Sequence, residues 1–244
     1  CAGRVTGMEQ QDILSMTLPE LQAAVQELGE PKFRAKQIFN WLHQKRVTDF
    51  SEMTTLSLPF RERLASDFCI NRLKIAKRLA SSVDDTVKYL YELPDGNYVE
   101  TVCMQYHHGT SLCISTQVGC RMGCRFCASA IAGFVRNLTP AEMLLQIYET
   151  ERAQNCKISS LVLMGIGEPL DNFDNVLRFL QLLSDPNGYG MSLRHVTVST
   201  CGVVPKILEL AEQRLGLTLS VSLHCPNDAG RSAIMPINRS YPID

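Results

Sequence analysis

Residues 119–128 read Gly-Cys-Arg-Met-Gly-Cys-Arg-Phe-Cys-Ala and place three cysteines, Cys120, Cys124 and Cys127, within eight positions. Thiolates at this C-x3-C-x2-C spacing can bind one face of a small iron–sulfur cluster from a single loop. A four-iron cluster held by three thiolates keeps one iron open to another molecule. The stretch therefore predicts a catalytic metal centre rather than a structural one.

Two other uses of these cysteines fit the sequence less well. A structural zinc site takes four Cys or His ligands, often as two C-x2-C pairs. No second pair follows at a suitable distance, and the nearest extra thiol, Cys113, lies seven residues upstream in an expected strand. A disulfide framework is typical of small secreted chains, whereas this chain has 244 residues and no secretion signal.

The composition is that of an ordinary globular protein, with 45% hydrophobic and 20% charged residues. The length allows one large domain or two small ones. No apolar run approaches 18 residues, so no transmembrane helix is expected. Cysteine use without a secretion signal predicts a reducing, cytoplasmic location. Because the first residue is Cys1, we expect the chain to begin inside a longer reading frame, with Met8 a possible start.

The charge is unevenly distributed along the chain. Residues 31–80 contain eleven Lys or Arg and four Asp or Glu, which gives this stretch +7, whereas the whole chain carries −1. A basic block of this kind can follow a phosphate backbone. A solvated helix face would show the same pattern, so charge alone leaves both interpretations open.

The N-terminal part, residues 8–72, is predicted to be a small helical and basic RNA-binding domain. One helix follows the capping box at residues 17–20, a second opens near Pro31, and a third begins near Pro59. Residues 73–106 are predicted to be a hairpin region, with strands at 87–93 and 98–106. The turn between them contains Pro94 and Gly96, which favour the required backbone angles.

Residues 107–244 are predicted to be an α/β domain, because strands and helices alternate. Strands are expected at 112–115, 160–164, 195–199 and 217–223, and helices at 140–152, 173–183 and 205–215. This order predicts parallel strands with right-handed crossovers and chemistry at the carboxyl ends of the strands. The cysteine loop and the segments 165–169, 199–200 and 222–224 all follow such ends. We expect a partial (β/α) barrel, truncated after about four strands, with one or two further units missing.

The cysteine loop and the segments at the strand ends resemble the sequence motifs of radical S-adenosylmethionine (SAM) enzymes. Among these enzymes, they resemble the dual-specificity RNA adenine-C2 methyltransferases (RlmN). The resemblance runs through almost the whole chain. It rests on Ser115-Thr116-Gln117-Val118-Gly119-Cys120, Gly133-Phe134-x-Arg136-Asn137-Leu138, Met164-Gly165-x-Gly167-Glu168-Pro169-Leu170, Val198-Ser199-Thr200-x-Gly202-Val203-Val204-Pro205 and Ser222-Leu223-His224-x-Pro226-Asn227.

The resemblance implies two cofactors, a [4Fe-4S] cluster on Cys120, Cys124 and Cys127, and SAM on its open iron. SAM contacts are implied for Gly167, Glu168, Ser199, Ser222, Leu223 and His224. Other roles fit some of these residues: Glu168 is a possible acid at a helix N-terminus, and the two serines are possible caps at strand ends.

The resemblance also implies a reaction on ribosomal RNA and tRNA. In the family, one SAM methylates a cysteine near the C-terminus, and a radical made from a second SAM activates that methyl group to add to adenine C2. Cys113 stands in the position of the cysteine that forms a transient disulfide and releases product. Glu100 matches the acid that accepts the C2 proton. Alternatively, Cys113 is a buried strand thiol and Glu100 a surface acid.

The methyl-carrying cysteine of the family lies beyond position 244, so the chain is expected to lack the C-terminal part of such an enzyme. The other cysteines (Cys1, Cys69, Cys103, Cys156, Cys201 and Cys225) are interpreted as structural or incidental. An electron donor such as flavodoxin, no membrane and a monomeric state are expected. The remaining alternatives are the sister activity on adenine C8, which gives antibiotic resistance, and a non-catalytic RNA-binding fragment.

Overall fold

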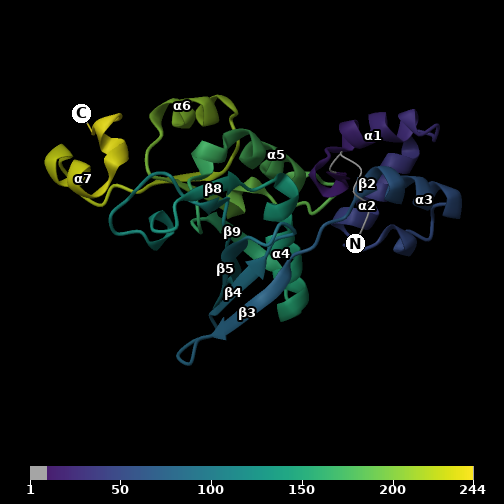
Figure 1. Ribbon diagram of the computed structural model, residues 1–244, viewed down its shortest axis with the longest axis horizontal. Helices are drawn as coiled ribbons and strands as arrows, with labels where there is room; N and C mark the ends of the chain where they lie inside the picture. Colours follow the sequence, from purple (N-terminus) through teal and green to yellow (C-terminus); the bar gives the residue numbers. More distant parts are fainter. Residues whose placement is uncertain (1–9, 244) are drawn as a thin grey trace. The chain divides into compact units, whose positions relative to one another are not determined.

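The computed structural model describes residues 10–243, so Cys1 and Met8 lie outside the described residues. The chain divides into two compact units, the first ending at Asn71 and the second beginning at Arg72 (Figure 1). No helix among residues 10–243 is both long and apolar enough to cross a membrane.

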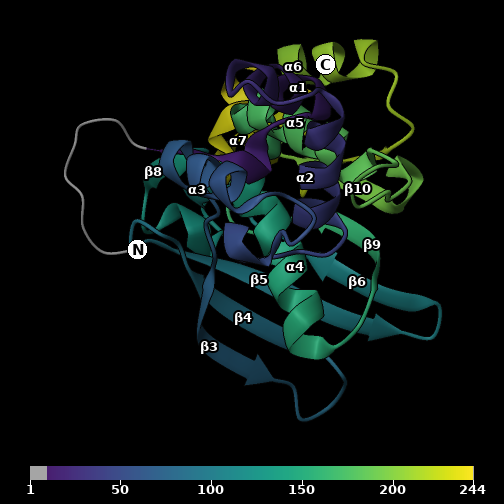
Figure 2. The same cartoon turned by 90° about the vertical axis from the view of Figure 1, so that its right-hand side faces the viewer.

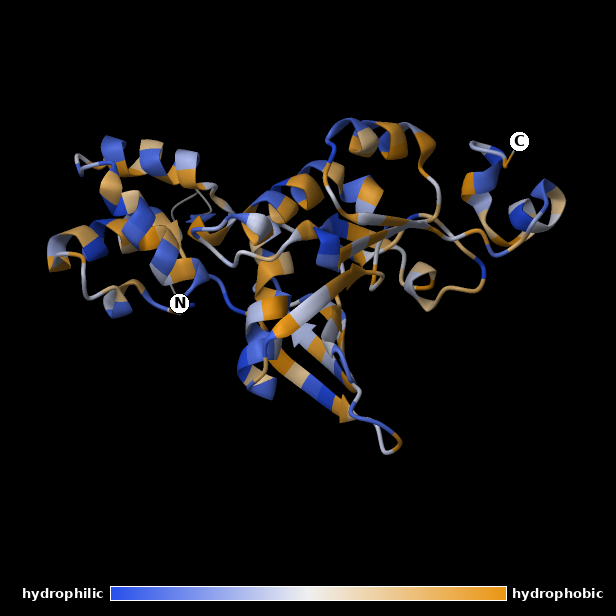
Figure 3. Cartoon of the chain, turned by 180° about the vertical axis from the view of Figure 1, so that it is seen from behind, coloured by the Kyte–Doolittle hydropathy of each residue, from blue (hydrophilic) through white to orange (hydrophobic). Residues whose placement is uncertain are grey.

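The first unit is a small helical domain, as predicted. Thr17 and Glu20 form the expected capping box at the start of its first helix. Each helix turns one apolar face into a common core and its polar face outward, which gives the alternating hues of Figure 3. Its elements are β1 (Gln11–Asp12), η1 (Ile13–Ser15), α1 (Leu18–Glu27), α2 (Phe33–His43), η2 (Phe50–Glu52), α3 (Leu58–Asp67) and β2 (Phe68–Cys69), with β1 and β2 paired in parallel.

The second unit is built on a seven-stranded sheet in the order β11-β10-β9-β6-β5-β4-β3. The four predicted parallel strands are confirmed: β6, β9, β10 and β11 are neighbours and run in parallel. The main strands are β3 (Lys74–Ala80), β4 (Val87–Glu92), β5 (Tyr98–Tyr106), β6 (Gly109–Cys113), β9 (Ile158–Leu163), β10 (Val196–Thr200) and β11 (Thr218–Val221).

The helices predicted in this unit are also present. They are α4 (Pro140–Gln154), α5 (Phe173–Ser184) and α6 (Val204–Glu212), followed by α7 (Asp228–Ile234). Short 3-10 segments are η3 (Ala128–Ala130), η4 (Pro169–Asn172), η5 (Leu193–His195) and η6 (Pro236–Arg239). Two further strands, β7 (Gln117–Gly119) and β8 (Phe134–Asn137), form an antiparallel pair beside the main sheet.

The predicted hairpin is present, but it is part of the main sheet. Strand β5 pairs with β6, so β4 and β5 extend the parallel strands on one side. A third antiparallel strand, β3, was not predicted and forms the edge of the sheet. The domain is therefore one continuous mixed sheet, in which an antiparallel half adjoins a parallel half.

Helix α4 packs on one face of the sheet (Figure 2), and the side chains of β4 and β5 that point to the other face are mostly only partly buried, so that side is called the open face. On the covered face, Tyr91 shares a hydrogen bond of 2.8 Å with Thr150 of α4, and Thr101 donates to Gln146 of α4 at 2.8 Å. Side chains alternate between the two faces of a strand. Glu100 and Val102 consequently point to the open face, where their side chains are only partly buried.

Candidate functional site

The cysteine loop lies between β7 and β8, which close its two ends. The amide of Cys120 donates to the carbonyl of Gly133 at 3.1 Å. Gly119 has a φ of +72°, and a Cβ there would lie 1.7 Å from the same carbonyl oxygen. A side chain at position 119 would therefore collide with Gly133, so only glycine fits where the two ends of the loop meet.

The three loop thiols are half-buried and lie close enough to influence one another electrostatically. Burial raises the pKa of Cys120 and of Cys124, and the nearby carboxylate of Glu168 and the other loop thiols add to the effect. Among residues 10–243, no three His, Cys, Asp or Glu side chains converge as they would around a single metal ion. An iron–sulfur cluster does not require its thiolates to converge on one point, because each thiolate binds its own iron. Three thiols on one loop fit such a cluster.

The segment 165–169 follows β9 and packs directly on the β6–β7 connection. Gly167 has a φ of +108°, and a Cβ there would meet the side chain of Gln117 at 2.6 Å. The carbonyl of Ile166 accepts hydrogen bonds from the amides of Thr116 and Gln117, at 2.9 and 3.2 Å. The expected cofactor loop is thus tied to the stretch that leads into Cys120.

Glu168 is buried, with 3% of its surface exposed, and both carboxylate oxygens accept hydrogen bonds from backbone amides. Oε1 accepts from Leu170 at 3.0 Å, which caps η4, and Oε2 accepts from Cys201 at 2.8 Å. The alternative role anticipated for Glu168, an acid at a helix start, is therefore present in the fold. The carboxylate also joins the end of β9 to the end of β10.

The other expected SAM contacts lie at the ends of β10 and β11. Ser199 is buried and stands opposite Ser220 in the register of these strands, and Ser222 donates its amide to the carbonyl of Thr200 at 2.9 Å. Leu223 is exposed at 46%. The ring of His224 lies 4.5 Å from the ring of Phe126. In the sequence, Phe126 stands between the second and third cysteines of the loop. This ring contact brings the end of β11 to the cysteine loop.

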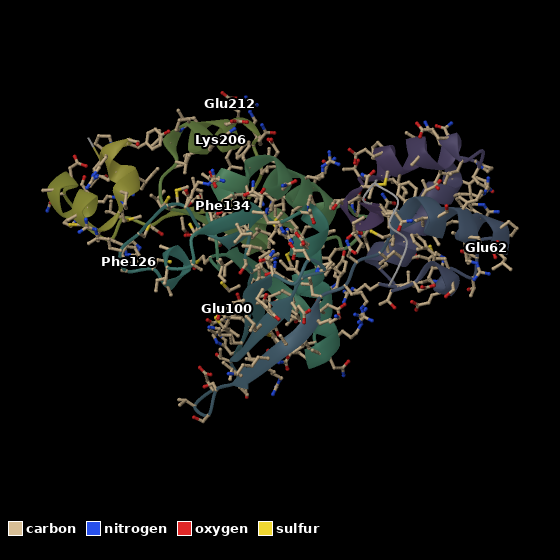
Figure 4. The ribbon with its side chains drawn as sticks, in the orientation of Figure 1. Glu62, Glu100, Phe126, Phe134, Lys206 and Glu212 are labelled. Atoms are coloured by element: carbon tan, nitrogen blue, oxygen red, sulfur yellow. The ribbon has the colours of Figure 1, made fainter. Side chains whose placement is uncertain are left out.

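Glu100 and Cys113 lie on the open face of neighbouring strands. Cys113 stands opposite Val102, two residues from Glu100 on the same face of β5. The carboxylate of Glu100 pairs with Lys88 of β4 at 2.6 Å. Burial raises the pKa of the Cys113 thiol. In Figure 4, the Glu100 side chain leaves β5 on the side where Phe126 of the cysteine loop also lies.

Four residues that shape this region were not predicted from the sequence as part of the site. Lys88 pairs with Glu100, and the rings of Phe126 and His224 are in tilted contact, with their planes at 53°. Cys201, interpreted as structural or incidental, donates its backbone amide to Glu168. Arg231, which is 4% exposed, donates to the carbonyl of Cys201 at 2.6 Å. Phe126 and Cys201 lie inside quoted motifs and could have been found there, whereas Lys88 and Arg231 carry no local signal.

No disulfide links the nine cysteines among residues 10–243. Cys103 and Cys156 lie together on the helix-covered side of the sheet, and burial raises the pKa of both thiols. They are remote from the open face, which agrees with a structural role.

Comparison with known families and proteins gives a consistent assignment. Residues 11–70 match the ribosomal RNA large subunit methyltransferase N-terminal domain, and residues 114–244 match the radical SAM superfamily. A relative from Lachnoclostridium phytofermentans, named a probable dual-specificity RNA methyltransferase RlmN, is 52% identical over 238 residues, which are 96% of this chain and 66% of that protein. A relative of the same name from Clostridium novyi is 47% identical over 233 residues, or 96% and 68%.

A solved structure supports the fold as well as the family. The crystal structure of a radical SAM methyltransferase from Sphaerobacter thermophilus superposes with a TM-score of 0.89 at 37% identity, covering 96% of this chain and 69% of that one. The chain thus spans about two thirds of the length of the relatives it matches. It belongs to the radical SAM superfamily and, within it, to the RlmN family.

Proposed function

We propose that this chain forms the radical-generating part of an RNA methyltransferase that methylates C2 of adenosine in ribosomal RNA and tRNA. One observation carries the proposal. The segment 165–169, which follows β9, is hydrogen-bonded to the connection that leads from Cys113 at the end of β6 to the cysteine loop, and Glu100 lies near Cys113 on the neighbouring strand β5. Family membership and the names of the relatives supply the reaction class and the RNA substrates.

The cofactors fit the residues present. Cys120, Cys124 and Cys127 would hold a [4Fe-4S] cluster, and SAM would bind its open iron against Gly167 and Glu168. Ser199 and the segment 222–224 would contact the rest of SAM. When bound, the two cofactors would supply a 5′-deoxyadenosyl radical. Gly167 suits this loop because its φ of +108° and its close contact with Gln117 leave no room for a side chain.

Two residues of the open face would act on the RNA. The carboxylate of Glu100 would accept the proton from adenine C2, and its ion pair with Lys88 would orient it. The thiolate of Cys113 would attack the enzyme sulfur that carries the RNA adduct. A sulfur–sulfur bond then forms, the sulfur–carbon bond breaks, and the electron pair stays with the carbon, which takes up a proton to become a methyl group.

The basic stretch 31–80 would contribute RNA contacts. It carries a charge of +7, and seven of its Lys and Arg lie in the first unit and four in the second, at residues 72–78. None of these eleven side chains is buried. Exposed cations can bind a phosphate backbone without sequence preference. We place the protein in the cytoplasm, as a monomer that receives electrons from a donor such as flavodoxin.

The test uses the full-length gene product, reconstituted anaerobically with iron and sulfide and supplied with SAM, a reductant and unmodified ribosomal RNA or tRNA. Mass spectrometry of the digested RNA should detect 2-methyladenosine. Detection of 8-methyladenosine instead would indicate the sister activity. RNA binding with no turnover of SAM would favour a non-catalytic binding module and overturn the proposal.

A further inference from the structure

Ser115 occupies the connection between β6 and β7, two residues after Cys113 and five before Cys120, and it is completely buried. Its hydroxyl donates to the backbone carbonyl of Glu100 at 2.6 Å and accepts from the amide of Ile166 at 3.0 Å. One side chain therefore joins the strand that carries the candidate proton acceptor to the loop expected to bind SAM.

Ser115 is itself held in place by Gln146 of α4, which is also completely buried. The Gln146 amide accepts from the Ser115 backbone N–H at 2.8 Å and donates to the Ser115 carbonyl at 2.9 Å. The same amide oxygen accepts from Thr101, the residue after Glu100. The helix, the strand and the loop thus meet in one satisfied polar network, and such networks fix a single arrangement.

We propose that Ser115 is a positioning residue for methyl transfer, which sets the distance between Glu100 and the Ile166–Glu168 loop. The inference rests on the proposed function, because it assigns Glu100 to the proton and the loop to SAM. A hydroxyl offers one donor and two acceptor positions, so a single Ser satisfies both backbone groups. Alanine would leave a buried carbonyl and a buried amide without their partner, and both segments could then shift.

The neighbouring residue provides a matched control. Thr116 is 1% exposed, and its hydroxyl oxygen has no hydrogen-bond partner among the described residues. The substitution Thr116→Val keeps the shape of the side chain and removes only that hydroxyl. It removes a buried hydroxyl one position away from Ser115 and disturbs neither Glu100 nor Ile166.

The experiment compares Ser115→Ala, Thr116→Val and the unsubstituted full-length enzyme after anaerobic reconstitution. It records SAM cleavage without RNA, kcat and KM for methylation, and the amount of covalent enzyme–RNA adduct. A misplacement of this kind can cost about 10- to 100-fold in rate. For Ser115→Ala we expect such a fall in methylation kcat and more adduct, but a smaller fall in SAM cleavage, because the loop keeps the hydrogen bonds from the amides of Thr116 and Gln117 to the Ile166 carbonyl. Thr116→Val should match the unsubstituted enzyme in all three.

A second readout does not depend on cofactors or turnover. In the apoprotein, the amide of Ile166 should exchange its hydrogen faster in Ser115→Ala and at the normal rate in Thr116→Val. If Ser115→Ala does not fold, Ser115→Cys, with its weaker donor and acceptor, should show the same changes at smaller size.

Two results would overturn the inference. One is a normal methylation rate together with unchanged exchange at Ile166. The other is an equal loss of SAM cleavage and methylation, which would mean that Ser115 supports only the cofactor loop. If the unsubstituted enzyme makes no 2-methyladenosine, the proposed function fails, whereas the exchange at Ile166 still tests the hydrogen bond.

Discussion

Replacing Arg231 with methionine should loosen the ends of two strands that carry expected SAM contacts. Arg231 is 4% exposed and belongs to α7. Its guanidinium donates to the carbonyl of Cys201 and to Asn238 Oδ1, both at 2.6 Å, and to the carbonyl of Ser222 at 3.4 Å. It therefore joins the segments that follow β10 and β11 to the last described helical turns.

The cost of Arg231→Met follows from these contacts. A hydrogen bond from a charged group contributes about 1.5–3 kcal/mol, and two short ones are lost. Methionine no longer buries a charge, which offsets part of this loss. We expect a net destabilisation of about 2–4 kcal/mol, which corresponds to a fall in melting temperature of about 5–15 °C for a unit of this size.

Thermal unfolding of the full-length protein measures this cost, and hydrogen exchange resolved by mass spectrometry locates it. Faster exchange should be confined to peptides covering residues 196–203, 218–224 and 228–239. The control is Arg239→Met, since Arg239 is exposed in the same part of the chain. This substitution should change the free energy of unfolding by less than about 0.5 kcal/mol. Equal melting temperatures for the two variants would refute the reasoning.

Two further predictions concern other parts of the second unit. Gly167→Ala should lower the melting temperature by more than Gly96→Ala, because both glycines have positive φ but only a Cβ at 167 would also collide with Gln117, at 2.6 Å; equal losses would contradict this. The Arg136 guanidinium, which donates to Asp95 at 2.6 Å, holds the pKa of Asp95 well below its usual value of 3.8. A carboxyl with a lowered pKa stabilises the fold above its ordinary pKa and loses that effect as the pH falls. Asp95→Asn should therefore lower the free energy of unfolding by at most about 1 kcal/mol at pH 7, and by progressively less below pH 4, as measured by urea unfolding. A loss that does not change with pH would argue against the pair.

Much of the fold could be predicted because local patterns dominate it. The apolar runs at 160–164 and 195–199 became β9 and β10, and the capping box at Thr17 starts α1. Strand β3 was missed because all seven of its residues are exposed and it pairs only with β4. An edge strand of this kind shows no apolar alternation, so only its neighbour determines that it forms.

In the candidate site, too, features that depend on neighbouring residues could be predicted, whereas contacts between distant segments could not. The spacing of the cysteines and the glycines around 165–167 could be interpreted directly, because the chemistry depends on residues close in sequence. The Ser115 and Gln146 network could not, because its partners come from four separate segments. Neither could the ring contact between Phe126 and His224, which joins residues 98 positions apart.

The most direct test of the central claim is iron binding by the cysteine loop. Anaerobically reconstituted full-length protein should show the absorbance and Mössbauer spectrum of a [4Fe-4S] cluster, and added SAM should alter the signal of one iron only. Replacing Cys120, Cys124 and Cys127 with alanine should abolish iron uptake. An unsubstituted protein that takes up no iron, or a triple variant that takes up the same amount, would contradict the account.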